Sequence, residues 1–320
     1  MEFKESYMTM RDGEKLYINK SIPRKEEEPV GVICIVHGSC EYSKRYNHFI
    51  SYLVSNGYIV YSYDLRGHGL SNKENETLGY FGESNGWNKL IYDLDEIINL
   101  IKNENEKLNL YLLGHSMGSF IVRHYSSMFS KKIDGIIATG TAHNSRLILR
   151  TGKLLAEIDI KKNGSKHRNK LLNKISYDSF SNKFKPIRTK QDWLTRDEKI
   201  VDEYIEDNLC GFIFTSDAFK DMFEGLLFIT DKDNIENTRK NLPILLLSGG
   251  SDPVGDNGKM VKQSYKEYKK CGIINIEMKL YKGMRHEILN EIGKEEVYKD
   301  ILIWINNNNN NNNEKTEEVL

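Results

Sequence analysis

One short segment of the chain carries a serine in a setting that suits nucleophilic chemistry. Gly114, His115, Ser116, Met117 and Gly118 fit the pattern G-x-S-x-G, between a buried apolar run and a segment with helical periodicity. A serine on such a strand-to-helix turn presents its hydroxyl at a helix N-terminus, and the two glycines let the strand and the helix pack closely. The hydroxyl becomes a nucleophile when a base removes its proton. The motif therefore predicts acyl transfer at Ser116.

A base and a carboxylate follow two later apolar runs. Two residues separate His286 from the run "IEMKLYKG", and one residue, Ser251, separates Asp252 from "LPILLLSGG". Functional groups of open α/β sheets gather at the carboxyl ends of strands, so these two residues are the predicted base and its carboxylate partner. His143 is the alternative base. Asp256 is the alternative carboxylate, but it precedes a helical pattern and is expected to cap that helix.

The oxyanion formed during acyl transfer needs two hydrogen-bond donors. The apolar run "VICIV" ends in His37, Gly38 and Ser39, and the flexible glycine can aim the Ser39 amide toward the nucleophile. The Met117 amide, at the start of the helix after Ser116, is the predicted second donor. Removing one such donor typically lowers the rate about 10²–10³-fold.

The elements that position these residues alternate along the chain. Near-continuous apolar runs at 31–36, 58–64, 110–114, 133–140, 243–250 and 276–281 are mostly separated by segments of helical periodicity. Strands that are apolar on both faces and alternate with helices form a mostly parallel, doubly wound α/β sheet. Before them, residues 7–22 alternate in polarity around Asp12-Gly13, which predicts an antiparallel hairpin.

The spacing of the runs divides the chain into three parts. Residues 142–217 form too long an interval for a simple crossover and are predicted to be an inserted helical cap. The α/β core is then residues 1–141 and 218–305. Residues 306–320 begin with eight consecutive asparagines and are expected to form a disordered tail.

Composition excludes several classes of protein. Lys plus Arg and Asp plus Glu are equal at 46 each among 320 residues, so no global charge favours a nucleic acid. Four cysteines without CxxC spacing predict neither a metal site nor a disulfide framework, and the chain start has no apolar leader. We therefore expect a cytoplasmic protein without a metal or an organic cofactor.

The charges of the predicted cap are unevenly distributed. Residues 161–190 hold ten basic residues and one acidic residue, and residues 191–210 hold seven acidic and two basic residues.

Five motifs in order give the chain its resemblance to a known family. They are "HGSCEYSKRY" at 37–46, "DLRGHGLS" at 64–71, "GHSMG" at 114–118, "SDP" at 251–253 and "GMRHE" at 283–287. Over residues 28–305 the chain resembles the α/β-hydrolase superfamily, in particular its monoacylglycerol lipase and lysophospholipase branch, often labelled serine aminopeptidase-like. The order serine, aspartate, histidine is that of this fold. Tyr42 departs from the family pattern, which has histidine there.

The resemblance implies a serine esterase that cleaves a small lipid ester, a monoacylglycerol or a lysophospholipid, through an acyl-enzyme at Ser116. It also implies an apolar acyl tunnel beneath the cap, and transient contact of the cap with micelles or membranes is expected. The predicted tunnel residues are Phe180, Trp193, Phe212 and Phe214, and the residues offered to one side of an amphipathic cap helix are Leu147, Ile148, Leu154, Leu155 and Ile158.

Three alternatives stay open at this point. An aminopeptidase on the same scaffold would need cap carboxylates, such as those between Asp192 and Asp207, to bind a free ammonium group. A non-catalytic ligand-binding homologue would use the pocket without the chemistry. An acyltransferase would need a second, acceptor site.

Overall fold

A single mixed sheet forms the centre of the molecule. The computed structural model describes residues 2–24, 28–72, 78–178 and 180–317, and within them the sheet has eight strands in the order β1-β2-β4-β3-β5-β6-β7-β8. The strands are β1 (Glu2–Thr9), β2 (Lys15–Ile22), β3 (Gly31–Val36), β4 (Tyr58–Tyr63), β5 (Leu110–His115), β6 (Gly135–Thr139), β7 (Ile244–Gly249) and β8 (Ile276–Tyr281). β1, β2 and β4 pair antiparallel, and all pairs from β4 to β8 are parallel. The predicted hairpin and the mostly parallel sheet are confirmed.

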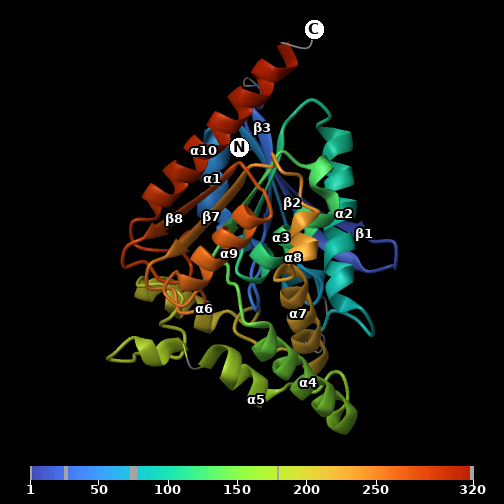
Figure 1. Ribbon diagram of the computed structural model, residues 1–320, viewed down its shortest axis with the longest axis vertical. Helices are drawn as coiled ribbons and strands as arrows, with labels where there is room; N and C mark the ends of the chain where they lie inside the picture. Colours follow the sequence, from blue (N-terminus) through green and yellow to red (C-terminus); the bar gives the residue numbers. More distant parts are fainter. Residues whose placement is uncertain (1, 25–27, 73–77, 179, 318–320) are drawn as a thin grey trace.

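Helices cover both faces of the sheet (Figure 1). Five neighbouring strands, β4, β3, β5, β6 and β7, are buried along their whole length, as strands apolar on both faces must be. α1 (Asn47–Ser55) and α10 (Lys294–Glu317) pack on one face. α2 (Gly86–Glu104), α3 (Met117–Phe129) and α9 (Lys259–Lys270) pack on the other. The fold is therefore the predicted doubly wound α/β arrangement.

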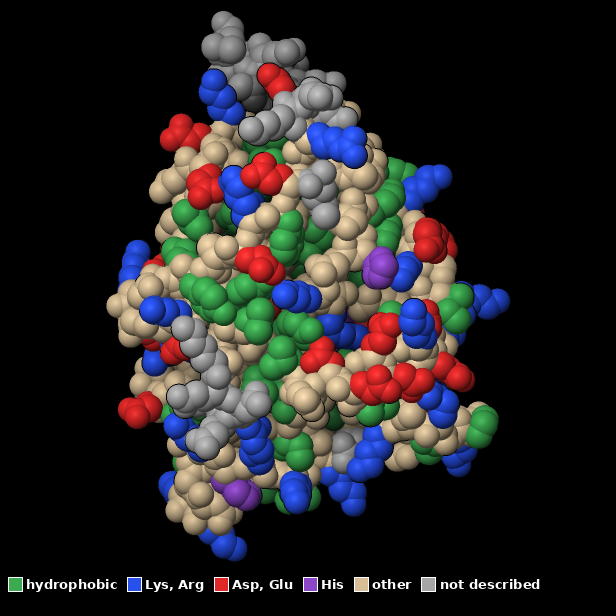
Figure 2. Space-filling model, turned by 180° about the vertical axis from the view of Figure 1, so that it is seen from behind, with side chains coloured by type: hydrophobic (Ala, Val, Ile, Leu, Met, Phe, Trp, Pro, Cys, Tyr) green, Lys and Arg blue, Asp and Glu red, His purple; other side chains and the backbone are tan. Residues whose placement is uncertain are grey.

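A group of helices between β6 and β7 lies across the end of the sheet at which the parallel strands finish (Figure 1). It comprises α4 (Arg146–Asn163), α5 (Lys170–Asn173), a π-helical turn (Lys174–Asp178), a 3₁₀ turn (Phe180–Lys183) and α6 (Glu198–Glu206). These elements fall within the range predicted for the cap, and we refer to them as the cap. α7 (Ser216–Ile229) packs against both α4 and α3, and α8 (Lys232–Glu236) leads on to β7. Basic side chains are frequent at this end of the molecule (Figure 2).

The start of the asparagine run is ordered, against the prediction of a disordered tail from residue 306. α10 continues through it to Glu317. Asn309 is 8% exposed, and its amide accepts hydrogen bonds from the Tyr111 hydroxyl (2.9 Å) and from Asn109 (3.0 Å). The Tyr58 hydroxyl likewise donates to Asn306 (2.5 Å). Composition alone could not reveal these contacts of Asn306 and Asn309, because their partners belong to distant strands and loops. The last three residues, 318–320, lie outside the described residues.

Among the helices that the structure describes, none has both the length and the apolar composition to cross a bilayer.

Candidate active site

Ser116 occupies a tight turn between β5 and α3. Its backbone has φ 52° and ψ −118°, a conformation that is strained for any residue with a side chain. A Cβ on Gly114 would stand 2.2 Å from the Gly118 carbonyl oxygen, and a Cβ on Gly118 would stand 2.1 Å from the Val36 carbonyl oxygen. Only glycine fits at either position. The turn therefore requires the G-x-S-x-G pattern.

His286 and Asp252 meet at the same edge of the sheet. The two residues are 1% and 0% exposed, and Nδ1 of His286 lies 3.0 Å from Oδ2 of Asp252. Asp252 also accepts hydrogen bonds from the Ser248 hydroxyl (3.0 Å) and the Val254 amide (2.9 Å), which fix its carboxylate. The carboxylate therefore orients the imidazole with Nδ1 as the donor.

The electrostatics of the pair favour a protonatable imidazole. Burial by itself lowers the pKa of His286, but the nearby Asp252 carboxylate, aided by Glu287 and Glu41, outweighs burial and raises the pKa above the ordinary 6.5. Burial opposes ionisation of Asp252 as well, and the His286 ring reverses this effect and lowers the pKa of that carboxyl.

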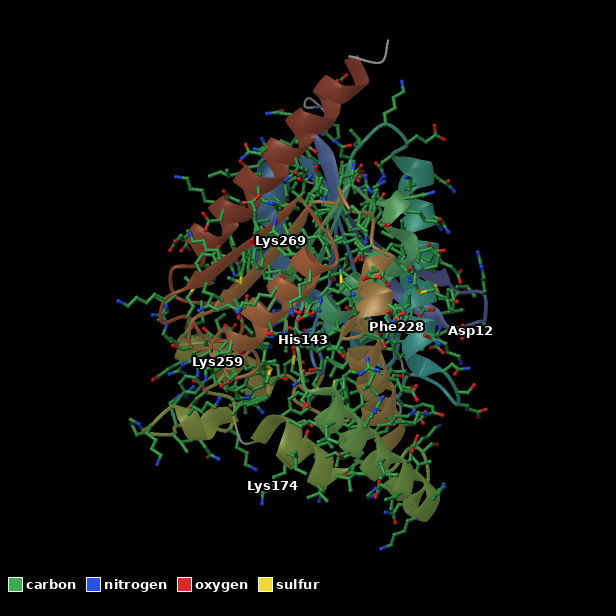
Figure 3. The ribbon with its side chains drawn as sticks, in the orientation of Figure 1. Asp12, His143, Lys174, Phe228, Lys259 and Lys269 are labelled. Atoms are coloured by element: carbon green, nitrogen blue, oxygen red, sulfur yellow. The ribbon has the colours of Figure 1, made fainter. Side chains whose placement is uncertain are left out.

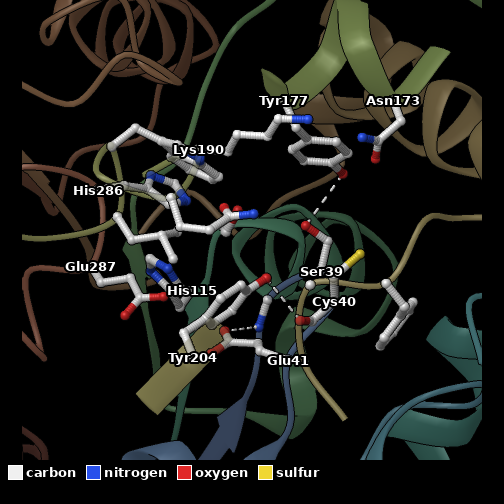
Figure 4. Close-up of a pocket in the computed structure, with 17 residues that line it drawn as sticks. Ser39, Cys40, Glu41, His115, Asn173, Tyr177, Lys190, Tyr204, His286 and Glu287 are labelled. Atoms are coloured by element: carbon white, nitrogen blue, oxygen red, sulfur yellow. Dashed lines mark hydrogen bonds between the residues drawn. The ribbon is translucent and has the colours of Figure 1, made fainter. Parts of the chain in front are cut away.

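Ser116 and His286 line one small cavity of about 50 Å³. Nε2 of His286 is buried and has no hydrogen-bond partner among the described residues, so this nitrogen is free to accept a proton. Figure 4 shows the pocket, with His286 and His115 on one wall and Ser39 opposite them. The hydrogen bond from Ser116 Oγ to Nε2 of His286 is therefore not formed in this structure. Catalytic hydrogen bonds of this kind often tighten only when a substrate is bound. The structure thus brings the serine, histidine and aspartate chosen from the sequence to one place.

The two predicted oxyanion donors are also at this place. Ser39 and Ser116 line both the small cavity and a larger one, and Met117 lines the larger one. In the described part of the chain, neither the Ser39 amide nor the Met117 amide donates to a protein acceptor. Gly38 directs its own amide to Oε1 of Glu41 (2.6 Å). Two unsatisfied amides beside a serine hydroxyl are what an oxyanion site requires.

The larger cavity is a mainly apolar tunnel of about 570 Å³ that runs from Ser116 to the cap. Of the four aromatic residues predicted to line it, only Phe180 does so. Trp193 and Phe212 instead line the small cavity, and Phe214 lines neither. Phe214 is fully buried against His68, with the ring centroids 5.6 Å apart, so its place in the tunnel was predicted wrongly.

The alternative base, His143, lies away from the cavity at Ser116. His143 is only half-buried and lines neither cavity. Burial lowers the pKa of His143 to about 4. His37 is bonded through both ring nitrogens, to the Leu65 amide (2.9 Å) and the Gly38 carbonyl (2.7 Å). Tyr42 donates to Asp207 (2.8 Å) and does not line the small cavity.

Tyr177 and Gly140 are among the residues of the site that were missed in the sequence. Tyr177 of the cap lines both cavities and donates to the Ser39 hydroxyl over 3.3 Å (Figure 4). No sequence pattern distinguishes this tyrosine from an ordinary core aromatic. Gly140 directly follows β6, and a Cβ there would stand 2.8 Å from Cε1 of His286. Its place at a strand end, in "ATG", is the signal that could have pointed to it.

Replacing Gly140 by alanine is expected to lower the rate of active-site labelling by a fluorophosphonate at least about 10-fold, because the new methyl displaces the imidazole by a fraction of an ångström. Gly164→Ala is the matched control. Gly164 has a similarly positive φ (91° against 60°) but nothing within 4 Å of its Cβ position. Equal labelling rates for the two variants would contradict this role of Gly140.

The fold and the geometry of the site together define an α/β-hydrolase. The family model of the serine aminopeptidases, S33, matches residues 27–293, and the chain belongs to this family. A monoacylglycerol lipase of Mycolicibacterium smegmatis is 23% identical over 288 residues, which span 88% of this chain and 89% of the lipase. Phospholipase YtpA of Bacillus subtilis is 25% identical over 277 residues, 86% of this chain and 95% of the phospholipase. A carboxyl esterase of Bacillus coagulans has the same fold, with a TM-score of 0.89, 23% identity and coverage of 97% and 99%.

Proposed function

We propose that the protein is a serine esterase that hydrolyses a lipid ester of the monoacylglycerol or lysophospholipid kind. The observation that carries this proposal is the apolar tunnel of about 570 Å³ that ends at Ser116, beside the Asp252-oriented imidazole of His286. A tunnel of this size and character suits a fatty acyl chain, which would place its carbonyl at the nucleophile. The names of the relatives support the same class of substrate.

The mechanism follows from the position of each group. Ser116 Oγ attacks the ester carbonyl while Nε2 of His286 takes its proton, and the Ser39 and Met117 amides stabilise the oxyanion. His286 then gives the proton to the leaving alcohol as the C–O bond breaks, which leaves an acyl-enzyme. Water, deprotonated by the same imidazole, cleaves the acyl-enzyme and frees the fatty acid and the serine.

The acid-rich segment of the cap offers no obvious site for the ammonium group of an aminopeptidase substrate. Asp192 accepts hydrogen bonds from the Thr189 amide and hydroxyl, and Asp202 pairs with Arg188 (2.6 Å). Within the described residues, no carboxylate of this segment lines the cavity at Ser116. These contacts favour ester over aminoacyl substrates.

The test is a substrate panel measured with one enzyme preparation: monoacylglycerols, lysophospholipids, a dissolved short-chain nitrophenyl ester and aminoacyl amides. We expect long-chain esters to have the highest kcat/KM. Turnover of the amides alone would contradict the proposal. Covalent labelling by a fluorophosphonate distinguishes a hydrolase from a ligand-binding homologue, which would remain unlabelled.

We further propose that the cap delivers substrate from a micelle or membrane surface. Leu147 and Ile148 of α4 are 75% and 64% exposed, and both line the tunnel, so the tunnel opens on an apolar surface. Leu154, Ile158, Leu171 and Ile175 extend this surface with exposures of 53–60%. Lys174, at its edge, points away from the body of the molecule (Figure 3).

The four free, buried cysteines support a reducing, cytoplasmic compartment.

Exchanging Leu154 and Ile158 together for serine should weaken binding to phospholipid vesicles about 10-fold or more, because two apolar side chains no longer leave water on binding. Neither residue lines the tunnel, so turnover of a dissolved short-chain ester should stay unchanged. Ile274→Ser is the control, since Ile274 is 63% exposed in the loop before β8, outside the cap. Vesicle sedimentation measures the effect. Unchanged binding by the double variant would contradict the role of this surface.

A further inference from the structure

A largely buried cluster of three charges borders the small cavity, and its two carboxylates, Glu41 and Glu287, line that cavity. Arg45, on the 3₁₀ turn Ser43–Tyr46, donates from Nη1 to Oε2 of Glu41 (2.7 Å) and to Oε1 of Glu287 (2.6 Å). Its Nη2 donates to Oε2 of Glu287 (2.8 Å), so the bond to Glu287 is bidentate. Glu41 and Glu287 are each 3% exposed. We call these three residues the charged clamp.

One end of the clamp holds the turn that carries the Ser39 amide. Oε1 of Glu41 accepts the Gly38 amide (2.6 Å) and the Tyr46 hydroxyl (2.7 Å). A carboxylate that binds the Gly38 amide fixes the orientation of the preceding peptide and the start of the next one. The Ser39 amide belongs to the peptide that follows Gly38. The bond between the Gly38 amide and Glu41 therefore helps to set the direction of the Ser39 amide.

The other end holds the loop that carries the base. Glu287 is the residue after His286, and its backbone amide donates to the Leu194 carbonyl (2.7 Å). Its side chain also accepts from Asn290 (3.2 Å). The base loop is thus fixed by the cap on one side and by Arg45 on the other. A single guanidinium connects the turn of the oxyanion donor to the loop of the general base.

The composition of the clamp suggests a purpose other than stability. Removing three charges from water costs more than their mutual attraction usually returns, and apolar residues of similar size often give a more stable fold. The bonds nevertheless have the short lengths and the forked geometry of strong charge-assisted pairs. Two carboxylates share one guanidinium, which leaves one net negative charge beside the imidazole.

We propose that Arg45, Glu41 and Glu287 are positioning residues, which hold the oxyanion turn and His286 in mutual register and supply a negative charge that supports the imidazolium during acyl transfer. This inference rests on the proposed ester hydrolysis. The test must therefore include a readout that needs only the nucleophile and its base.

Several groups besides the clamp face His286. Asp252 bonds to its Nδ1, the His115 ring lies 4.7 Å away between centroids, and the Trp193 ring lies 5.0 Å away. Burial, with a smaller effect of His286, lowers the pKa of His115 to about 4, so His115 is neutral where the enzyme would work. Lys190 lines the same cavity but is exposed to water. The clamp and Asp252 are therefore the charges whose removal should change the titration of His286.

The experiment compares Glu41→Gln, Glu287→Gln and their double variant with a matched control, Asp93→Asn. Asp93 also bonds a buried arginine, Arg66 (2.7 Å), which bridges to Asp12 away from the cavity at Ser116. For each protein we would measure thermal unfolding, the rate of fluorophosphonate labelling and the pH dependence of kcat/KM for a dissolved ester. Arg45→Lys tests whether a single ammonium can replace the fork.

Each clamp variant should lower kcat and the labelling rate about 10-fold or more with little change in KM. The midpoint of the pH profile should move to lower pH in the two glutamine variants, because a negative charge that favours the imidazolium is lost. The double variant should cost less than the product of the single effects, since either change breaks the connection through Arg45.

The control should lower the melting temperature without moving the pH midpoint. If the glutamine variants behave like Asp93→Asn, with lower stability but an unchanged midpoint and labelling rate, the clamp is only structural and the proposal fails. A wild-type protein that is labelled by the fluorophosphonate but turns over no ester would overturn the proposed function alone, and the labelling rates would still decide the role of the clamp.

Discussion

Ester hydrolysis by the Ser116→Ala variant is expected to fall by several orders of magnitude, up to about 10⁶-fold in kcat. The reason is chemical, since alanine has no oxygen to form the acyl-enzyme, while the oxyanion amides and the tunnel stay in place. KM should change little, because the acyl chain still binds in the same cavity. Turnover of a long-chain monoacylglycerol by carefully purified variant and wild-type protein provides the measurement.

A serine away from the site gives the matched control for this variant. Ser55 ends α1, is exposed, and donates to the Tyr52 carbonyl within its own helix (2.8 Å), so Ser55→Ala should retain full activity. The melting temperature of Ser55→Ala should stay near that of the wild type. The melting temperature of Ser116→Ala should stay near it or rise, because the strained turn no longer carries a hydroxyl beside the imidazole. Substantial activity in Ser116→Ala would place the nucleophile elsewhere.

Replacing Asp252 by asparagine should lower kcat/KM about 10⁴-fold, although the two side chains have nearly the same shape. An asparagine can donate to Nδ1 of His286, which moves the imidazole proton to Nε2, the nitrogen that must accept the serine proton. The change also removes the charge that raises the pKa of His286 above 6.5. Wild-type activity should therefore rise with pH through a midpoint above 6.5, and the residual activity of the variant should rise through a midpoint at lower pH.

Steady-state kinetics of a dissolved ester across the pH range checks this prediction. Ser248→Ala is the graded control, because it removes one neutral hydrogen bond (3.0 Å) to the same carboxylate and leaves the charge. It should cost far less activity and move the midpoint only slightly. An Asp252→Asn variant within about 10-fold of the wild type would mean that another carboxylate orients the base.

The sequence could locate the candidate site because strand ends and glycine spacing are local features with a fixed spatial meaning. Ser116, Asp252 and His286 each follow an apolar run, and parallel strands bring such positions to one edge of the sheet. Gly114 and Gly118 are required because a Cβ at either position would stand only 2.1–2.2 Å from a carbonyl oxygen. Their spacing was therefore a reliable guide to the turn.

The parts that could not be predicted depend on tertiary contacts that no local pattern encodes. Phe214 is excluded from the tunnel because the bond from the Thr215 amide to the Gly79 carbonyl (3.0 Å) draws this segment against the core aromatics. On α4, Leu149 and Ala156 are the buried residues, while the apolar side predicted for this helix is largely exposed. The clamp joins positions 41, 45 and 287, and the link from Glu287 to a residue 242 positions away is invisible to periodicity.

The asparagine repeat has a property that follows from its uniformity. Two of its amides, Asn306 and Asn309, are held by hydroxyls of strand tyrosines, and the residues between and after them are chemically identical to them. A chain that lacked up to four of the eight asparagines would still carry asparagine at both anchoring positions. The attachment of α10 is thereby insensitive to shortening of the repeat by up to four residues.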